Sequence, residues 1–352
     1  MSKKKILVVD DSAFMRSVIT RQVEKDDRLE LVGTAANGRE AVEKALELRP
    51  DVITLDIEMP EMNGLEALGE IMKKCPTKVI MVSSLTKEGA EETMKALELG
   101  AVDFFPKAMD DAQKSIFNHG EMLREKIYGA ATIRNVSGLA KRESTPAPAV
   151  PKAPQPDSQL RFKNAEIALI GISTGGPKAL HTIAPDLPST LRVPLLIVQH
   201  MPPNFTAAMA KRLNQLSRLT VLEAADGMKL EADHAYIVPG GSQCEVENRN
   251  GEKVFKVQPD TQDTIYKPSV EVTAESLHRV YGGRVLAVMM TGMGRDGIEG
   301  FTKLKEAGAY VVAQDEATSV VYGMPKAVVD KGLANEVLPL AEIPRTLERL
   351  LN

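Results

Sequence analysis

The sequence predicts an α/β protein of two domains: an N-terminal (βα)5 unit and a C-terminal, doubly wound α/β unit with a largely parallel sheet. Apolar, β-branched runs alternate with amphipathic segments along both halves, which is typical of parallel sheets covered by helices. A proline-rich stretch at 144–158 interrupts this alternation. The chain has 352 residues, which is enough for each half to bury its own core.

The first half contains five strand-like runs. Segments 38–48 and 87–99 space their apolar residues by three and four positions, so we expect helices there, and a helical extension over 111–130. Strands that alternate with helices form an open sheet whose working residues collect at the carboxyl ends of the strands. The expected strands are 6–9, 29–35, 51–57, 78–83 and 101–105.

Charged and hydroxyl residues stand at four of these strand ends: Asp10 with Asp11, Asp56, Ser83, and Lys107. Carboxylates that meet at one edge of a sheet repel each other unless a cation lies between them. Oxygen ligands favour Mg²⁺ where a phosphate also binds. Lys107 supplies a positive charge for a phosphoryl oxygen, and Ser83 supplies a hydroxyl donor. We therefore expect a site for Mg²⁺ and a phosphoryl group at this edge.

Residues 4–121 resemble the receiver domain of response regulators through these strand-end residues. The resemblance implies a role for each: phosphoacceptor Asp56, metal-binding Asp10 and Asp11 together with Asp56, and switch residues Ser83 and Lys107. Phosphorylation would add about 1.5 to 2 negative charges and draw the switch residues inward. One position departs from the family, because Ala108 follows the lysine where proline is usual.

Residues 122–160 form the expected connection: the end of the helical extension, then a proline-rich linker. Five prolines lie between 144 and 158, among small and polar residues. Such a segment buries too little apolar surface to order itself, and its prolines stiffen it towards an extended form. We expect a tether, with a proline-rich recognition peptide as the alternative.

The second half, 161–352, again alternates strands and helices. A polar, turn-centred segment at 246–257 predicts a hairpin inserted into this pattern. The expected strands are 167–172, 193–199, 235–238, 285–290 and 310–313, and the expected helices are 177–183, 205–216, 270–280 and 297–307.

Three residues of this half predict a nucleophilic site. Ser173 follows the first strand in a glycine-rich turn, His200 follows the second, and Asp296 follows a third. Each alone is more often a capping, packed or turn-forming residue, but the topology brings all three to one sheet edge. A base is needed to take the proton of a serine hydroxyl, and a carboxylate then orients and stabilises the imidazole. Ser173, His200 and Asp296 therefore form the expected catalytic triad.

The turn around Asp296 admits two interpretations. The amides of Thr174 and of the loop that contains Met293 could form an oxyanion hole. Alternatively, 292–297 matches the G-x-G-x-x-G pattern of dinucleotide-binding domains, with Asp315 where a ribose-binding acid would stand. Asp296 weakens this alternative, because it puts a negative charge where a pyrophosphate would bind.

Composition excludes several other classes. The net charge of −4 and the lack of a helix-turn-helix pattern argue against a nucleic-acid partner. Two distant cysteines suit a reducing compartment. No apolar run is long enough for a signal peptide or a bilayer span, so we expect a soluble, cytoplasmic protein without membrane insertion.

Over essentially its full length the chain resembles the CheB family of chemotaxis protein-glutamate methylesterases. The resemblance rests on the receiver-like half and linker, followed by Ile-Ser-Thr-Gly-Gly, Gln-His-Met-Pro and Thr-Gly-Met-Gly-x-Asp-Gly. It implies that Ser173, His200 and Asp296 are the triad and that Thr174 and Met293 lie at the oxyanion site. Lys-Pro-Ser-Val, at 267–270, is similar to a further family motif, with its acidic position at Glu271.

The resemblance also implies an activity and its partners. Family members demethylate glutamate γ-methyl esters on chemoreceptors, and many deamidate receptor glutamines. Mg²⁺ is implied at the receiver and no cofactor at the esterase site, with a chemotaxis histidine kinase as phosphodonor. We expect a monomer whose unphosphorylated receiver covers the Ser173 edge. The alternatives are a dinucleotide-binding oxidoreductase under receiver control and a non-catalytic phospho-switch scaffold.

Overall fold

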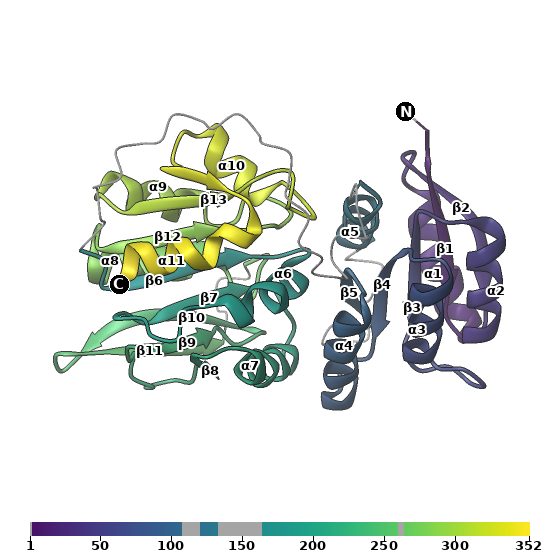
Figure 1. Cartoon of the computed structure of the whole chain (residues 1–352), viewed down its shortest axis with the longest axis horizontal. Coiled ribbons are helices and arrows are strands. Elements are labelled where there is room, and N and C mark those ends of the chain that lie inside the picture. The colour runs from purple at the N-terminus through teal and green to yellow at the C-terminus, as the bar shows by residue number, and fades with distance from the viewer. Residues whose placement is uncertain (1, 108–119, 133–163, 260–263) are drawn as a thin grey trace.

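The computed structural model describes residues 2–107, 120–132, 164–259 and 264–352. Figure 1 shows two α/β units side by side, with α4 and β5 of the first unit facing α6 and α7 of the second. The expected proline-rich linker and the part of the helical extension at 111–119 lie outside the described residues. Among the described residues, no helix has the length and apolar character needed to cross a bilayer.

The first unit is a five-stranded parallel sheet in the order β2-β1-β3-β4-β5. The inner strands are buried because helices cover both faces, so their sequences are continuous apolar runs. The strands are β1 Lys4–Val9, β2 Leu29–Ala35, β3 Val52–Asp56, β4 Lys78–Ser83 and β5 Asp103–Pro106, and the helices are α1 Ala13–Glu24, α2 Gly38–Leu48, α3 Gly64–Lys74, α4 Lys87–Leu99 and α5 Gly120–Thr132.

The second unit is a seven-stranded parallel sheet in the order β14-β13-β12-β6-β7-β9-β8. Its strands are β6 Ile167–Ile172, β7 Leu195–Gln199, β8 Thr220–Glu223, β9 His234–Ile237, β12 Val285–Met289, β13 Tyr310–Gln314 and β14 Glu336–Leu338. The antiparallel hairpin consists of β10 Ser242–Arg249 and β11 Glu252–Pro259. The helices are α6 Gly176–Ile183, α7 Phe205–Leu216, α8 Val270–Tyr281, α9 Ile298–Glu306, α10 Met324–Asp330 and α11 Ile343–Leu351, with short 3-10 turns η2 Ala184–Asp186 and η3 Leu340–Glu342.

The strand order places a switch point at β6. This first strand pairs with β7 on one side and with β12 on the other, so the chain builds the sheet outward in both directions from it. Ligand sites of open α/β sheets form at such a point, beyond the carboxyl ends of the strands. The residues that follow β6, β7 and β12 are therefore the ones that meet there.

The predicted fold class is confirmed in both units, and the inserted hairpin is present. Two short edge strands, β8 and β14, were not predicted. Each has exposed positions and only three or four residues, which is too short a run to show a period. Helices α10 and α11 were also missed, although α11 spaces its buried Ile343, Leu347 and Leu350 as a helix does.

Candidate active site and phosphorylation site

Ser173 stands in a tight turn between β6, which is fully buried, and the helix α6. Its carbonyl oxygen accepts a hydrogen bond from Gly176 N–H at 2.8 Å, and its own N–H donates to Thr291 O at 3.0 Å. Gly175 has φ of 76°, a conformation that suits glycine, and any side chain there would collide with Val320. The glycine-rich turn thus fixes the serine at the switch point of the sheet.

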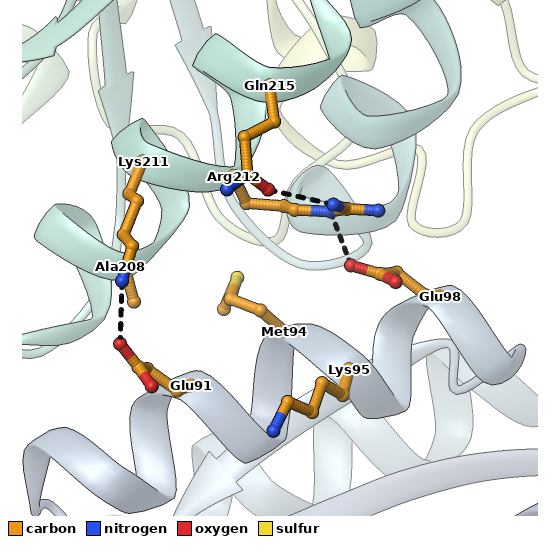
Figure 2. Close-up of a pocket in the computed structure, with 8 residues that line it drawn as sticks. All are labelled: Glu91, Met94, Lys95, Glu98, Ala208, Lys211, Arg212 and Gln215. Atoms are coloured by element: carbon orange, nitrogen blue, oxygen red, sulfur yellow. Dashed lines mark hydrogen bonds and ion pairs between the residues drawn. The ribbon is translucent and has the colours of Figure 1, made fainter.

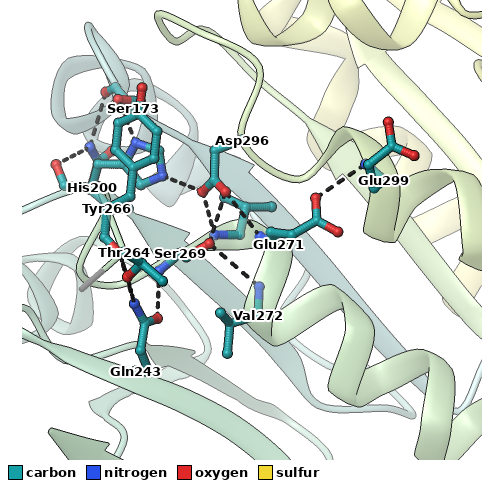
Figure 3. A network of polar contacts seen from close by, with 12 residues as sticks. Ser173, His200, Gln243, Thr264, Tyr266, Ser269, Glu271, Val272, Asp296 and Glu299 are labelled. Atoms are coloured by element: carbon teal, nitrogen blue, oxygen red, sulfur yellow. Dashed lines mark hydrogen bonds and ion pairs between the residues drawn. The ribbon is translucent and has the colours of Figure 1, made fainter. Parts of the chain in front are cut away.

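His200 lies between Ser173 and Asp296, as Figure 3 shows. The imidazole Nδ1 is 3.0 Å from Ser173 Oγ, and Nε2 is 2.7 Å from Asp296 Oδ2. An ionised carboxylate only accepts hydrogen bonds, so Nε2 carries the proton and Nδ1 is the nitrogen that accepts from the serine. The nitrogens have the opposite assignment in chymotrypsin-type triads, but the order of the three groups is the same.

Asp296 is held by the amino-terminal end of α8 as well as by His200. Its carboxylate accepts hydrogen bonds from Ser269 Oγ at 2.8 Å, Val270 N–H at 2.6 Å and Glu271 N–H at 3.3 Å. Burial alone raises the pKa of Asp296, but the hydrogen bonds from His200, Ser269 and Val270 outweigh it and hold the pKa below its ordinary value. Asp296 is therefore an anion in a largely buried site.

In the described part of the chain, two of the amides expected at the oxyanion site are free to donate, and two neighbouring amides of the loop are already occupied. Within the described chain, the N–H groups of Thr174 and Met293 donate no hydrogen bond to protein. By contrast, Thr291 N–H donates to the side chain of Gln314, and Gly292 N–H donates to Val321 O. Thr291 N–H and Gly292 N–H are therefore not available to an oxyanion, because this part of the loop is tied to the end of β13 and to the segment after it.

The first unit gathers its predicted acids at the carboxyl edge of its sheet. Asp10, Asp11 and Asp56 each offer a carboxylate oxygen within 4.8 Å of the others. Lys107 Nζ donates to Asp56 Oδ2 at 2.5 Å and lies 3.3 Å from Asp10 Oδ2. Burial, together with the charge of Asp10, raises the pKa of Asp56 to about 6 against the lowering effect of Lys107.

This acidic cluster fits a divalent cation. Burial raises the pKa of Asp10 despite the opposing charge of Lys107, and the buried Asp10 Oδ2 accepts no hydrogen bond among the described residues. Mg²⁺ is bound by oxygen ligands, commonly by carboxylates of this kind. Asp10, Asp11 and Asp56 are therefore the residues that could hold it.

Ser83 lies at the neighbouring strand end but does not contact Asp56 through a hydrogen bond. Its buried hydroxyl donates to Gly89 O, in the first turn of α4, at 3.1 Å. The structure therefore brings Asp10, Asp56 and Lys107 into contact and leaves the Ser83 hydroxyl bound to α4.

The two units meet at the turn that carries Ser173. Asp103 of β5 accepts a hydrogen bond from the backbone N–H of Gly175 at 3.1 Å and is also paired with Lys126 of α5 at 2.6 Å. Phe104 stacks on Phe205 of α7, with ring centroids 4.7 Å apart. The receiver-like unit thus contacts the residue two positions after the serine.

Ion pairs extend this contact between α4 and α7. Figure 2 shows Glu91 paired with Lys211 at 3.0 Å and Glu98 paired with Arg212 across a groove that both helices line. Most of these side chains are partly or largely exposed, so each pair contributes little to stability by itself. They give the interface a polar rim around the stacked rings.

Sequence reasoning missed Ser269 and Asp103 as site residues. Ser269 was inside the motif at 267–270, and its position before the helical pattern was the available signal, since serine is a common N-cap. The side chain of Glu271, the acidic position of this motif, instead accepts from Glu299 N–H at the start of α9. Asp103 had no signal, because its partner Gly175 belongs to the other unit.

Comparison with known proteins matches each half of the chain to a protein family. A family model described as CheB methylesterase matches residues 168–347, and one described as response regulator receiver domain matches residues 6–115. The chain belongs to the CheB methylesterase family. A "Protein-glutamate methylesterase/protein-glutamine glutaminase 2" of Carboxydothermus hydrogenoformans is 44% identical, with 100% of both chains covered.

A second relative and a solved structure agree with this assignment. A protein-glutamate methylesterase/protein-glutamine glutaminase of Thermotoga maritima is 43% identical over 99% of this chain and 98% of its own. The crystal structure of the Thermotoga maritima CheB methylesterase catalytic domain matches with TM-score 0.50 and 41% identity, covering 52% of this chain and 97% of that one. The oxidoreductase alternative is unsupported, and the loop that suggested it brings Asp296 to His200.

Proposed function

We propose that this CheB-family chain hydrolyses the γ-methyl esters of glutamates on chemoreceptors, and the side-chain amides of receptor glutamines, with Ser173 as the nucleophile. The observation that carries this proposal is the chain of contacts from Ser173 through His200 to an ionised Asp296. The names of the full-length relatives supply the substrate class.

The proposed reaction follows from the geometry. His200 Nδ1 takes the proton of Ser173 Oγ, which attacks the carbonyl carbon, and the negative charge moves to the carbonyl oxygen. The amides of Thr174 and Met293 then bind this oxyanion, where a single donor is typically worth about 3–4 kcal/mol. Collapse expels methoxide (or the amide nitrogen), which takes the proton from the imidazolium and leaves as methanol or ammonia. Water, activated by His200 in the same way, hydrolyses the acyl-enzyme and frees the glutamate and Ser173.

Asp296 stabilises the imidazolium and fixes the imidazole tautomer. Its bonds from Ser269 and the two amides of α8 leave it little freedom to move away from His200. The dipole of α8 also favours a carboxylate at this position. The esterase site needs no cofactor for this chemistry.

In the receiver unit, we propose that Asp56 accepts a phosphoryl group from a chemotaxis histidine kinase. Mg²⁺, held by Asp10, Asp11 and Asp56, would neutralise charge on the phosphoryl oxygens there. Lys107, already bonded to Asp56, supplies the protein's own positive charge. Ser83 is the switch hydroxyl: to reach the phosphoryl group it must leave Gly89 O, which removes one contact between β4 and the first turn of α4.

Regulation then acts through the interface. The unphosphorylated receiver is docked against the Ser173 turn through Asp103 and through α4, and this excludes a bulky helical substrate. The carboxylate of Asp103 accepts a hydrogen bond from Gly175 N–H, one residue from the oxyanion amide of Thr174. A negative charge at this position opposes a developing oxyanion. Phosphorylation favours the undocked state by loosening α4 and β5.

The domain boundaries 4–121, 122–160 and 161–352 stay predictions, as do cytoplasmic location and the monomeric state. Their support is the sequence pattern and the resemblance on which they were based.

The test measures methanol released from methylated chemoreceptors, and ammonia released from receptors that carry glutamine, by the full chain with a small-molecule phosphodonor and Mg²⁺. We expect release by the parent and a loss of about 10⁴-fold or more in Ser173→Ala. Ser217→Ala is the matched control and should retain the parent rate. Ser217 is the C-cap of α7, and its hydroxyl accepts from Leu219 N–H rather than contacting the triad. Near-normal release by Ser173→Ala would rule out this serine as the nucleophile.

A further inference from the structure

Tyr266 covers one face of the His200 imidazole. The two rings lie nearly parallel, with centroids 4.2 Å apart and an interplanar angle of 12°. Figure 3 shows the tyrosine ring over the imidazole. The tyrosine hydroxyl extends towards Gly294 in the loop after β12. The ring therefore lies between the general base and the loop that contains Met293.

The backbone beneath Tyr266 is firmly anchored. Gln243 of β10 is 4% exposed, and its Nε2 donates to Tyr266 O at 2.8 Å. The other end of the same amide, Oε1, accepts from Ser269 N–H at 3.0 Å. One buried glutamine thus fixes both the residue that stacks on His200 and the residue that bonds Asp296.

Stacking controls the motions that the in-plane hydrogen bonds leave free. Contacts at Nδ1 and Nε2 orient the imidazole within its plane, but they resist tilting of the ring only weakly. An aromatic ring at 4.2 Å blocks that tilt and keeps water off this face. It also attracts the imidazolium that forms when His200 takes the serine proton, because an aromatic face favours a cation. Burial raises the pKa of the Tyr266 phenol, so the ring stays neutral.

We propose that Tyr266 is a positioning residue for the esterase reaction: its ring holds His200 in line with Ser173 and Asp296 and stabilises the imidazolium. This inference rests on the proposed function, since it assigns no reaction of its own. The favourable contact with charge arises only as the proton moves, so it lowers the barrier for acylation without strengthening substrate binding. The ring carries this role and the hydroxyl does not.

The experiment compares Tyr266→Leu with Tyr266→Phe in the full chain, with methylated receptor, phosphodonor and Mg²⁺. Tyr266→Leu should lower kcat about tenfold, equivalent to about 1.4 kcal/mol, with KM nearly unchanged. Tyr266→Phe keeps the ring and should stay within about twofold of the parent. Ile265→Ala is the matched control, because the neighbouring side chain is 86% exposed and makes no stack, and it should retain the parent kcat.

A spectroscopic readout separates positioning from general stability. The ring protons of His200, assigned by comparison with His200→Gln, should lose their ring-current shielding in Tyr266→Leu and keep it in Tyr266→Phe. Equal losses of kcat in the Phe and Leu variants would overturn the proposal and assign the effect to the hydroxyl. A parent-like kcat in the Leu variant would also overturn it. An inactive parent would instead refute the proposed function itself, so the two failures are distinguishable.

Discussion

The two units each place a buried aspartate at the carboxyl edge of a parallel sheet, and the two carboxylates behave in opposite ways. The pKa of Asp56 is raised to about 6, whereas the pKa of Asp296 is lowered, although both side chains are largely buried. Asp56 has Lys107 as its positive partner and lies beside a second acid, Asp10. Asp296 accepts from His200 and from three donors at the start of α8.

The difference shows what each site still requires. The environment of Asp296 already satisfies its negative charge, so the site is organised for catalysis before substrate binds. The environment of Asp56 does not, because burial destabilises the ionised carboxylate more than Lys107 and the backbone N–H of Glu58 stabilise it. Such a carboxylate gains from a cation and a phosphoryl group, and it responds to their arrival. One fold class thus supports a preorganised site and a responsive one.

The largest expected effect tests the preorganised site. Asp296→Asn should lower kcat by about 10³–10⁴-fold, because the amide can present its N–H₂ to His200 and favour the wrong tautomer. Methanol release from methylated receptors measures this. Asp315→Asn is the control, since Asp315 directly follows β13 and its carboxylate accepts from Thr318, not from His200. A parent-like rate for Asp296→Asn would mean that the buried anion is not needed.

Removal of the receiver tests whether the two sites are coupled. Deletion of residues 1–140 should raise the basal rate of methanol release about tenfold or more, because the Ser173 turn loses its contact with Asp103. A complete shift from 1:99 to 99:1 in the ratio of undocked to docked chains would require about 5.5 kcal/mol of differential stabilisation. This figure is the upper limit for the expected effect. The solved catalytic domain of the Thermotoga maritima relative supports the use of the truncated chain. An inactive or unchanged truncation would contradict the coupling.

A smaller effect is expected from the support of Asp296. Ser269→Ala removes one of its hydrogen bonds and an N-cap of α8, and should lower kcat about tenfold. Ser269→Thr keeps the hydroxyl and is the matched control. Circular dichroism should show an unchanged fold at assay temperature, which separates the loss of orientation from unfolding. Equal rates in the alanine and threonine variants would mean that the Ser269 hydroxyl is not needed to orient Asp296.

The smallest effect concerns the stability of the receiver against pH. A raised native pKa means that the folded chain binds more protons than the unfolded chain between about pH 4 and 6, so stability attributable to Asp56 falls as pH rises through this window. In chelator, Asp56→Asn should therefore gain about 1–3 kcal/mol over the parent at pH 8 and nothing below pH 4. Added Mg²⁺ should narrow the difference at pH 8. Urea unfolding at both pH values measures it, and a pH-independent difference would contradict the charge argument.

The fold class was predicted correctly and ten site residues were proposed from the sequence, because both follow from local patterns. Long apolar runs mark buried strands, and Asp56, Ser173 and His200 each stand directly at or after such a run. The missed residues depend on folded contacts. Asp103 acts on the other unit, and Tyr266 meets His200 from a segment between β11 and α8. No spacing rule encodes which of two distant loops will lie over an imidazole.

In the proposed function, phosphorylation of Asp56 controls hydrolysis at the Ser173 site. This proposal is tested most directly by methanol release from methylated receptors, with and without phosphodonor and Mg²⁺, in the parent and in Asp56→Asn. We expect the donor to stimulate the parent at least about tenfold, whereas Asp56→Asn should keep a measurable basal rate and not respond. Stimulation of Asp56→Asn to the parent level would contradict the proposal.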